Sequence, residues 1–210
     1  MSNELNDNQQ QQIYACFAQL LDYPTPGYIE SINTCIDLLK ADYATAATLV
    51  ADFQNRIKAI PMSRLEEVYT ETFDINPACH IFAGHILFGE SFKRNAFMAS
   101  LAEEYQERNF STGKELVDHI PLLLKFLSIS SPDDAFTEDL AADCLVPVFQ
   151  KMNTNFPDDA ANPYMPLLRS VSIVLEKFYP KKSEPSPNPA AEHDHSYDEN
   201  SFPLVYFKEK

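Results

Sequence analysis

The amino-acid sequence predicts an all-α fold, a single-domain helical bundle of about seven to nine helices. Apolar residues recur three and four positions apart through most of the chain, which is the spacing of amphipathic helices. The chain has only four glycines in 210 residues, which argues against a β fold with many tight turns. No stretch in the body of the chain alternates apolar and polar residues as a half-buried strand does.

The expected helices follow one another with short connections. Their approximate limits are Ile13–Leu21, Pro26–Leu39, Tyr43–Ile60, Ser63–Ile75, Ser91–Arg108, Pro121–Ile129, Phe136–Met152 and Pro163–Phe178. Thr25-Pro26 and Asn162-Pro163 each place a capping residue before a proline, which is typical of a helix start. Ser63 followed by Glu66 matches a capping box. Pro147 predicts a kink or break in the helix that contains it.

The two ends of the chain differ from its body. Residues 1–12 are polar, and we expect them to be frayed. Residues 181–200 are rich in Pro, Ser, Asp, Glu and His, a composition typical of disorder, and 202–207 are apolar again. We therefore expect one helical domain over 1–180 and an acidic, proline-rich tail with an apolar end over 181–210. We expect that end to dock, with the peptide groove considered below as its most attractive site.

Charge and cysteine content limit the functional class. The formal net charge is −15, which disfavours nucleic acid as a partner and favours a basic one. The four cysteines lie in apolar stretches without C-x-x-C spacing, as buried thiols of a reducing compartment do. No signal peptide and no apolar run long enough to span a membrane is apparent, so we expect a cytoplasmic protein without stable membrane insertion.

The segment from Glu115 to Leu127 is the clearest local signal. Asp118 and His119 stand side by side before Pro121, which fits the first turn of a helix and pushes its predecessor out of the helical region. We therefore expect a helix to begin near Ile120, with the Asp-His pair at its N-terminus. In the simplest interpretation Asp118 only caps this helix and His119 points to water. In the functional one His119 is a titratable group held beside a carboxylate.

Catalytic and metal sites have little support. His80 and His85 are five residues apart and do not share a helical face, and no zinc-ligand spacing occurs. No nucleophile motif or phosphate-binding glycine loop is present. We expect no metal and no bound cofactor.

If the helices that begin at Ser63, Ser91 and Pro121 pack together, polar residues at their ends form an acidic rim around an apolar groove: Glu66, Glu67, Glu71, Asp74, Glu90, Asp118 and His119. Such a groove suits an amphipathic peptide that carries arginines.

Four patterns then occur in order along the chain. They are L-x-x-x-Y-x-x-x-F-D over Leu65–Asp74, H-x-x-x-G-E-S-x-x-R over His85–Arg94, E-L-V-D-H-I-P-L-L-L-K-F-L over Glu115–Leu127, and N-P-Y-x-x-L-L over Asn162–Leu168. Together they resemble the TorD/DmsD/NarJ family of molybdoenzyme maturation chaperones, most of all its NarJ branch, the nitrate reductase delta subunits. Asn95 and Val117 stand where that branch usually has glycine and proline.

The resemblance implies a dedicated all-helical chaperone and not an enzyme. Such proteins bind the N-terminal segment of a molybdenum-cofactor oxidoreductase catalytic subunit, often a twin-arginine leader or its remnant, and keep the apoenzyme ready for cofactor insertion. The family's Asp-His pair maps onto Asp118 and His119. Around it we add the neighbouring positions of the matched patterns as peptide-binding candidates: Tyr69, Phe73, His85, Glu90, Arg94 and Leu122.

Three alternatives remain open at this stage. The first is a TorD/DmsD-type chaperone that proofreads the intact leader of an exported molybdoenzyme. The second is a small enzyme that uses Asp118 and His119 as an acid–base pair. The third is a helical scaffold subunit without a peptide site.

Overall fold

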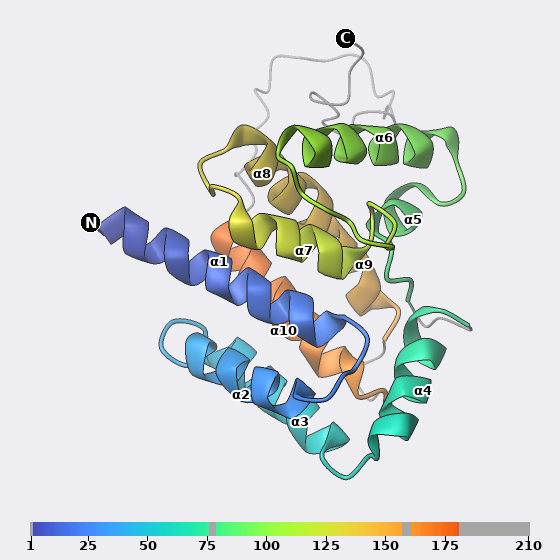
Figure 1. The fold of residues 1–210 in the computed structure, drawn as a ribbon. Helices are drawn as coiled ribbons and strands as arrows, with labels where there is room; N and C mark the ends of the chain where they lie inside the picture. The colour runs from blue at the N-terminus through green and yellow to red at the C-terminus, as the bar shows by residue number, and fades with distance from the viewer. Residues whose placement is uncertain (1, 76–78, 157–160, 181–210) are drawn as a thin grey trace, which may run out of the picture.

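The computed structural model describes residues 2–75, 79–156 and 161–180, and this part of the chain is helical throughout apart from its connections (Figure 1). The helices are α1 (Ser2–Leu21), α2 (Tyr28–Leu39), α3 (Ala44–Ile57), α4 (Met62–Phe73), α5 (Ala83–Phe88), α6 (Phe92–Glu107), α7 (Ile120–Ile129), α8 (Ala135–Asp139), the π-helical η1 (Leu140–Leu145), α9 (Val146–Thr154) and α10 (Tyr164–Phe178). Segments α8, η1 and α9 run on without a break, so the described residues form nine helical rods, as predicted. None of the described helices is long and apolar enough to cross a membrane.

Helix α1 is the centre of the bundle. It lies between α7 and α2, while α3 pairs with α10 and α10 packs on α9 (Figure 1). The expected stripe of α1 is fully buried, with Ile13, Phe17, Leu20 and Leu21 at most 1% exposed. Burial of each such side chain contributes about 1.5–3 kcal/mol before ordering costs. The period of the apolar residues therefore predicts the core face of this helix correctly.

The N-terminus differs from the expectation of a frayed segment. Helix α1 already begins at Ser2, eleven residues before the first apolar stripe residue. Two of its polar side chains have partners far away in sequence: Gln10 donates to the Tyr179 hydroxyl at 3.0 Å, and Gln11 donates to the Ser130 carbonyl at 2.7 Å. Gln10 also donates to the nearby Tyr14 hydroxyl at 3.0 Å. Hydrogen bonds of this kind leave no periodic apolar signal, so the sequence pattern did not reveal them.

Two of the predicted helix starts are wrong in detail. The residue before α2 is Gly27, whose φ of +94° favours glycine, and not Thr25. The residue before α4 is Pro61, with no side-chain cap, so the capping box of Ser63 and Glu66 does not form. Asn162 does act as expected, since its Oδ1 accepts from the Tyr164 backbone N–H at 2.9 Å.

The helix predicted to be kinked or broken at Pro147 continues past it, through a π-helical segment that directly precedes Pro147. Pro147 lies in the first turn of α9, directly after the π-helical residues of η1. Proline offers no N–H to the preceding turn, and a π turn is one way for a helix to continue past such a gap. The less regular segment expected over 79–90 contains the short helix α5.

The expected three-helix arrangement around a groove is wrong. Helices α6 and α7 do meet, with the rings of Tyr105 and Phe126 centred 4.9 Å apart. Helix α4, however, lies at the opposite end of the molecule from α6 (Figure 1). The predicted tail over 181–210 lies outside the described residues, so its separation from the helical domain stays a prediction.

Candidate functional site

The N-terminus of α7 is held by a short backbone pairing with the segment before α5. The Ala83 N–H donates to the Asp118 carbonyl at 2.8 Å, and the Ile120 N–H donates to the Ile81 carbonyl at 2.9 Å. Phe82 and His119 form the isolated antiparallel bridge between these bonds. Helix α7 begins at Ile120 with Pro121 in its first turn, as predicted, and His119 is the residue before it.

Asp118 forms a buried ion pair. Its side chain is fully buried, and its Oδ2 accepts from Arg94 Nε at 3.1 Å, while the Arg94 side chain is only 14% exposed. The other oxygen, Oδ1, has no hydrogen-bond partner in the described part of the chain. A Cβ at Gly84 would lie 2.8 Å from Oδ2, so the pair needs glycine there. The simpler interpretation of Asp118 as the cap of α7 is therefore wrong.

The ion pair continues into a chain of polar contacts toward the surface. Arg94 Nη1 donates to Glu90 Oε1 at 3.0 Å, and the same oxygen lies 3.1 Å from His85 Nδ1. The rings of His85 and His80 are in contact at a tilt of 52°, with centroids 3.8 Å apart. Partial burial, the neighbouring His85 and Arg94 lower the pKa of His80. Four of the predicted site residues, His85, Glu90, Arg94 and Asp118, thus form one connected cluster.

His119 faces a different environment from Asp118. It is 6% exposed, so it does not point to water, and its ring lies 5.6 Å from the Phe82 ring between centroids. The nearest carboxylate is that of Glu115, whose Oε2 is 3.9 Å from His119 Nδ1. Burial lowers the pKa of His119, and four carboxylates oppose this shift: Glu115, Asp22, Asp74 and Asp118.

A groove opens beside His119, between α1, α7 and the connection before α7. Its volume is about 590 Å³, and Ala15, Ala18, Leu122 and Ile129 supply apolar walls. Its charged lining groups are Asp22, Glu115 and Lys125. A second depression of about 470 Å³ between α1 and α2 shares Gln19 and Asp22 with the first and adds Glu30, with no lysine or arginine in its lining.

Sequence reasoning missed the α1 wall of this groove. Neither Asp22 nor Gln19 belongs to a sequence pattern that indicates a binding site. The pairing of α1 with α7 joins residues about a hundred positions apart, which no local pattern reveals. Of the predicted residues, His119 and Leu122 line the groove.

Tyr69 and Phe73 lie in the core. They are 3% and 0% exposed, and Tyr69 Oη donates to the Leu21 carbonyl at 3.2 Å. Their rings pack on each other and on Tyr164, at centroid distances of 4.9–5.8 Å. Periodic aromatic residues on a helix more often pack in the core than bind a ligand, and Tyr69 and Phe73 are both core residues.

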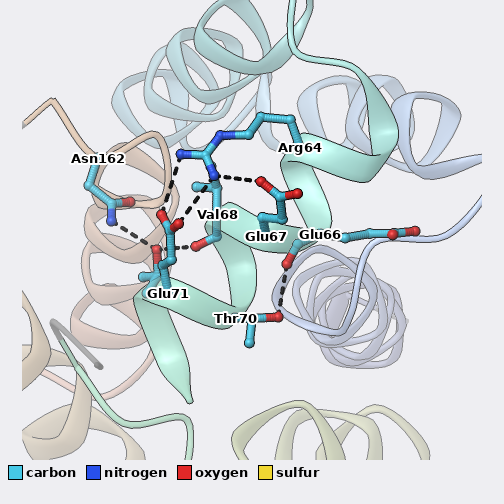
Figure 2. Close-up of polar contacts among 8 residues, drawn as sticks. Arg64, Glu66, Glu67, Val68, Thr70, Glu71 and Asn162 are labelled. Atoms are coloured by element: carbon cyan, nitrogen blue, oxygen red, sulfur yellow. Dashed lines mark hydrogen bonds and ion pairs between the residues drawn. The ribbon is translucent and has the colours of Figure 1, made fainter. Parts of the chain in front are cut away.

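The acidic residues of α4 do not form the expected rim. Figure 2 shows Arg64 reaching two of them, with Nη1 2.7 Å from Glu67 Oε2 and 3.1 Å from Glu71 Oε1. Asn162 Nδ2 donates to Thr72 Oγ1 at 2.9 Å, which ties α4 to the start of α10 (Figure 2). Of the expected rim residues on α4 and at its C-cap, Asp74 is the one whose carboxylate raises the pKa of His119. In the described part of the chain, no group of three or more His, Cys, Asp or Glu side chains is placed to hold a metal ion.

Comparison with known proteins gives three results. Residues 37–168 match the model of the nitrate reductase delta subunit family. The chain is 27% identical over 130 residues to the nitrate reductase molybdenum cofactor assembly chaperone NarW of Escherichia coli (strain K12), which covers 61% of this chain and 54% of NarW. The chain thus spans about half the length of that relative.

The crystal structure of a redox enzyme maturation protein from Archaeoglobus fulgidus aligns with a TM-score of 0.49 and 18% identity, over 80% of this chain and 93% of that one. All eight predicted site residues fall within the span that matches the family model, whereas the α1 wall of the groove lies before it.

Proposed function

This chain belongs to the nitrate reductase delta subunit family, and from that premise we propose that it is a dedicated assembly chaperone of a molybdenum-cofactor oxidoreductase. It binds the N-terminal segment of the apo catalytic subunit and keeps the subunit ready for cofactor insertion. Its NarW relative is named for molybdenum cofactor assembly, in agreement with this role. The work takes place in the cytoplasm, before the client is exported or docked at a membrane.

The observation that carries the proposal is the groove between α1 and α7. Its apolar walls suit one face of an amphipathic helix, and its carboxylates Asp22 and Glu115 suit basic residues at the edge of that face. Apolar contacts hold the peptide, while the net negative charge of −15 steers it toward the protein. His119 and Leu122 contact the bound segment directly. The cluster of Asp118, Arg94, Glu90 and His85 positions the start of α7.

The acid–base alternative finds no support in this geometry. Asp118 pairs with Arg94, and the ring of His119 packs on Phe82 beside Glu115. The two residues therefore belong to different contacts and do not form a hydrogen-bonded pair. A scaffold subunit without a peptide site does not account for a groove of about 590 Å³ with carboxylates at its edge.

Calorimetric titration with synthetic peptides tests the function. The peptides are the N-termini of the molybdoenzyme catalytic subunits encoded in the same organism, with and without any twin-arginine leader, at rising salt concentration. We expect one of them to bind, and to bind more weakly as salt rises because the carboxylates are screened. Preference for an intact leader would assign the TorD/DmsD type of client in place of the NarJ type.

Two groove variants and a matched control sharpen the test. Asp22→Asn and Glu115→Gln each remove one lining carboxylate, and we expect each to slow association several-fold. Glu103→Gln removes an exposed carboxylate of α6 that does not line the groove, and it should leave association unchanged. Absence of binding by every such N-terminus at low salt, or equal effects of all three variants, would refute the proposal.

A further inference from the structure

The last helix of the described chain, α10, ends beside one end of the groove between α1 and α7. Tyr179, the residue after α10, accepts through its hydroxyl from Gln10 Nε2 of α1 at 3.0 Å. On the same turn of α1, Gln11 donates to the carbonyl of Ser130, the residue after α7, at 2.7 Å. Ala15 of the groove lining lies one turn further along α1. The chain beyond α10 therefore starts next to the groove (Figure 1).

The groove has an apolar end and an acidic end. Helices α1 and α7 run antiparallel along it, so the start of each lies beside the end of the other (Figure 1). Ala15 and Ile129 line the end next to α10, and the Ile129 side chain is 65% exposed. Asp22 and Glu115 line the opposite end, together with His119. A segment that enters from α10 meets apolar walls first and carboxylates last.

Residues 202–210 have the same polarity in sequence. The apolar run Phe-Pro-Leu-Val-Tyr-Phe comes first, and Lys208 and Lys210 follow it. Burial of the apolar side chains would supply affinity, and attraction between the lysines and the carboxylates would set the direction. Residues 183–201, by contrast, contain five acidic side chains and no lysine or arginine. The net negative charge of the protein disfavours binding of that linker, so the complementary segment is 202–210.

The linker is long enough for this contact. Residues 181–201 separate α10 from the apolar run, and a linker of this length spans about 25 Å. The groove extends from Ala15 to Asp22 along α1, which is about 11 Å. A tethered segment is present at an effective concentration of about 1 mM, so an intrinsic Kd of about 0.1 mM would fill the groove in about nine molecules out of ten.

We propose that residues 202–210 occupy the groove between α1 and α7 of their own chain, and that a client has to displace them. The apolar run lies against the walls that include Ala18, Leu122 and Ile129, and the two lysines approach Asp22 and Glu115. The contact is autoinhibitory, and it shares its groove with the proposed function. It requires no client, however, so it is tested without one.

Site-specific photo-crosslinking in the full-length protein tests the contact. Phe207 is replaced by p-benzoylphenylalanine, the protein is irradiated without a client, and tryptic peptides are mapped. We expect cross-links to peptide 1–40, which carries the α1 wall, and to peptides 115–125 and 126–151, which carry the α7 wall. The same probe at Tyr197 in the linker is the control and should give few of them.

Three outcomes of the cross-linking would overturn the proposal. Cross-links to peptide 95–108 would place the segment on α6, where Asn95 and Met98 line a separate depression of about 500 Å³. Cross-linked dimers would assign the groove to the segment of a second copy. Equal yields from the probes at Phe207 and Tyr197 would mean that residues 202–210 have no specific contact.

Methyl NMR of the full-length protein gives a second readout. Aromatic rings shift the resonances of methyl groups that they contact, so Leu204→Ser combined with Phe207→Ser should move the Ile129 methyl resonances. Ile57, buried at the end of α3 and outside the groove, is the internal reference and should not move. Tyr197→Ser is the matched control and should move neither. An unchanged Ile129 resonance in the double variant would overturn the proposal.

Client binding separates this inference from the proposed function. If the segment competes with the client, Leu204→Ser combined with Phe207→Ser should bind the client peptide up to about tenfold more tightly than the unmutated protein. Equal affinities for a client peptide that does bind would overturn the competition. Failure of every client peptide to bind would refute the proposed function alone, because the cross-links and the Ile129 resonances are measured without a client.

Discussion

Asp118 and His119 are neighbours in sequence, but their side chains belong to two different electrostatic environments. The charge of Asp118 is matched inside the protein by Arg94, and the pair is almost completely buried. Four carboxylates oppose the effect of burial on the pKa of His119, and this residue lines an open groove. The first environment fixes the start of α7 to α5 and α6. The second environment has two lining carboxylates, Asp22 and Glu115, against one lysine, Lys125, and this excess of negative charge favours a partner that supplies positive charge.

The largest effect on stability is expected at the buried pair. Asp118→Asn keeps the shape of the side chain but leaves the mostly buried Arg94 guanidinium with only the exposed carboxylate of Glu90 as its counter-charge, which should cost about 3 kcal/mol. A mere helix cap would cost about 1 kcal/mol, so the magnitude separates the two roles. For a chain of this size we expect Tm to fall by about 6–12 °C.

A double-mutant cycle provides the control for this prediction. Arg94→Met alone should also destabilise, whereas Asp118→Asn combined with Arg94→Met should be less destabilising than the sum of the two. Additive effects in chemical denaturation would show that the two side chains are not coupled.

A smaller loss is expected at Gly84. The added methyl group of Gly84→Ala would meet Asp118 Oδ2 at 2.8 Å and Phe97 Cδ1 at 3.2 Å, so the ion pair must shift, at a cost of about 1–3 kcal/mol. Gly113→Ala is the comparison, since an added Cβ there meets nothing within 4 Å and only the φ of +64° opposes it, which should cost about 1 kcal/mol of backbone strain. Equal losses in denaturation experiments would mean that close approach to Asp118 is not what requires glycine at position 84.

The two environments also mark how far the sequence predicts the site. The Asp-His pair, the start of α7 and the cluster of Arg94, Glu90 and His85 follow from local patterns and from the family resemblance. What the sequence did not reveal is that Asp118 and His119 serve different contacts, because the backbone pairing with residues 81–83 is non-local. The interior position of Tyr69 and the α1 wall of the groove also depend on helix packing, and a stripe of apolar residues is the same whether it faces a core or a groove.

A pH dependence is expected on the His119 side. Its pKa is lowered in the folded state because burial outweighs the surrounding carboxylates, so the unfolded chain binds the proton more readily. Its contribution is therefore absent above pH 6.5 and becomes a loss of stability as pH falls below that value. We expect the unfolding free energy to decline from pH 7 to 5.5, and to decline less in His119→Gln.

His80 provides the comparison for this slope. Its pKa is also lowered, so His80→Gln should remove part of the same decline. Because His80 lies closer to the surface, its part should be the smaller one, and the double variant should be nearly flat over this range. A steeper decline in His119→Gln than in the unmutated protein would show that the carboxylates, and not burial, dominate at His119.

The smallest effect is expected for an arginine that pairs at the surface. Arg64 contacts Glu67 and Glu71 as Arg94 contacts Glu90 and Asp118, but its side chain is 50% exposed against 14% (Figure 2). In water the attraction is weak and is offset by the ordering of long side chains. Arg64→Met should therefore leave Tm unchanged, whereas Arg94→Met lowers it by several degrees. A matching fall in Tm in both variants would show that burial is not what distinguishes the two ion-pair clusters. The buried ion pair of Asp118 would then stabilise the start of α7 no more than an exposed ion pair does.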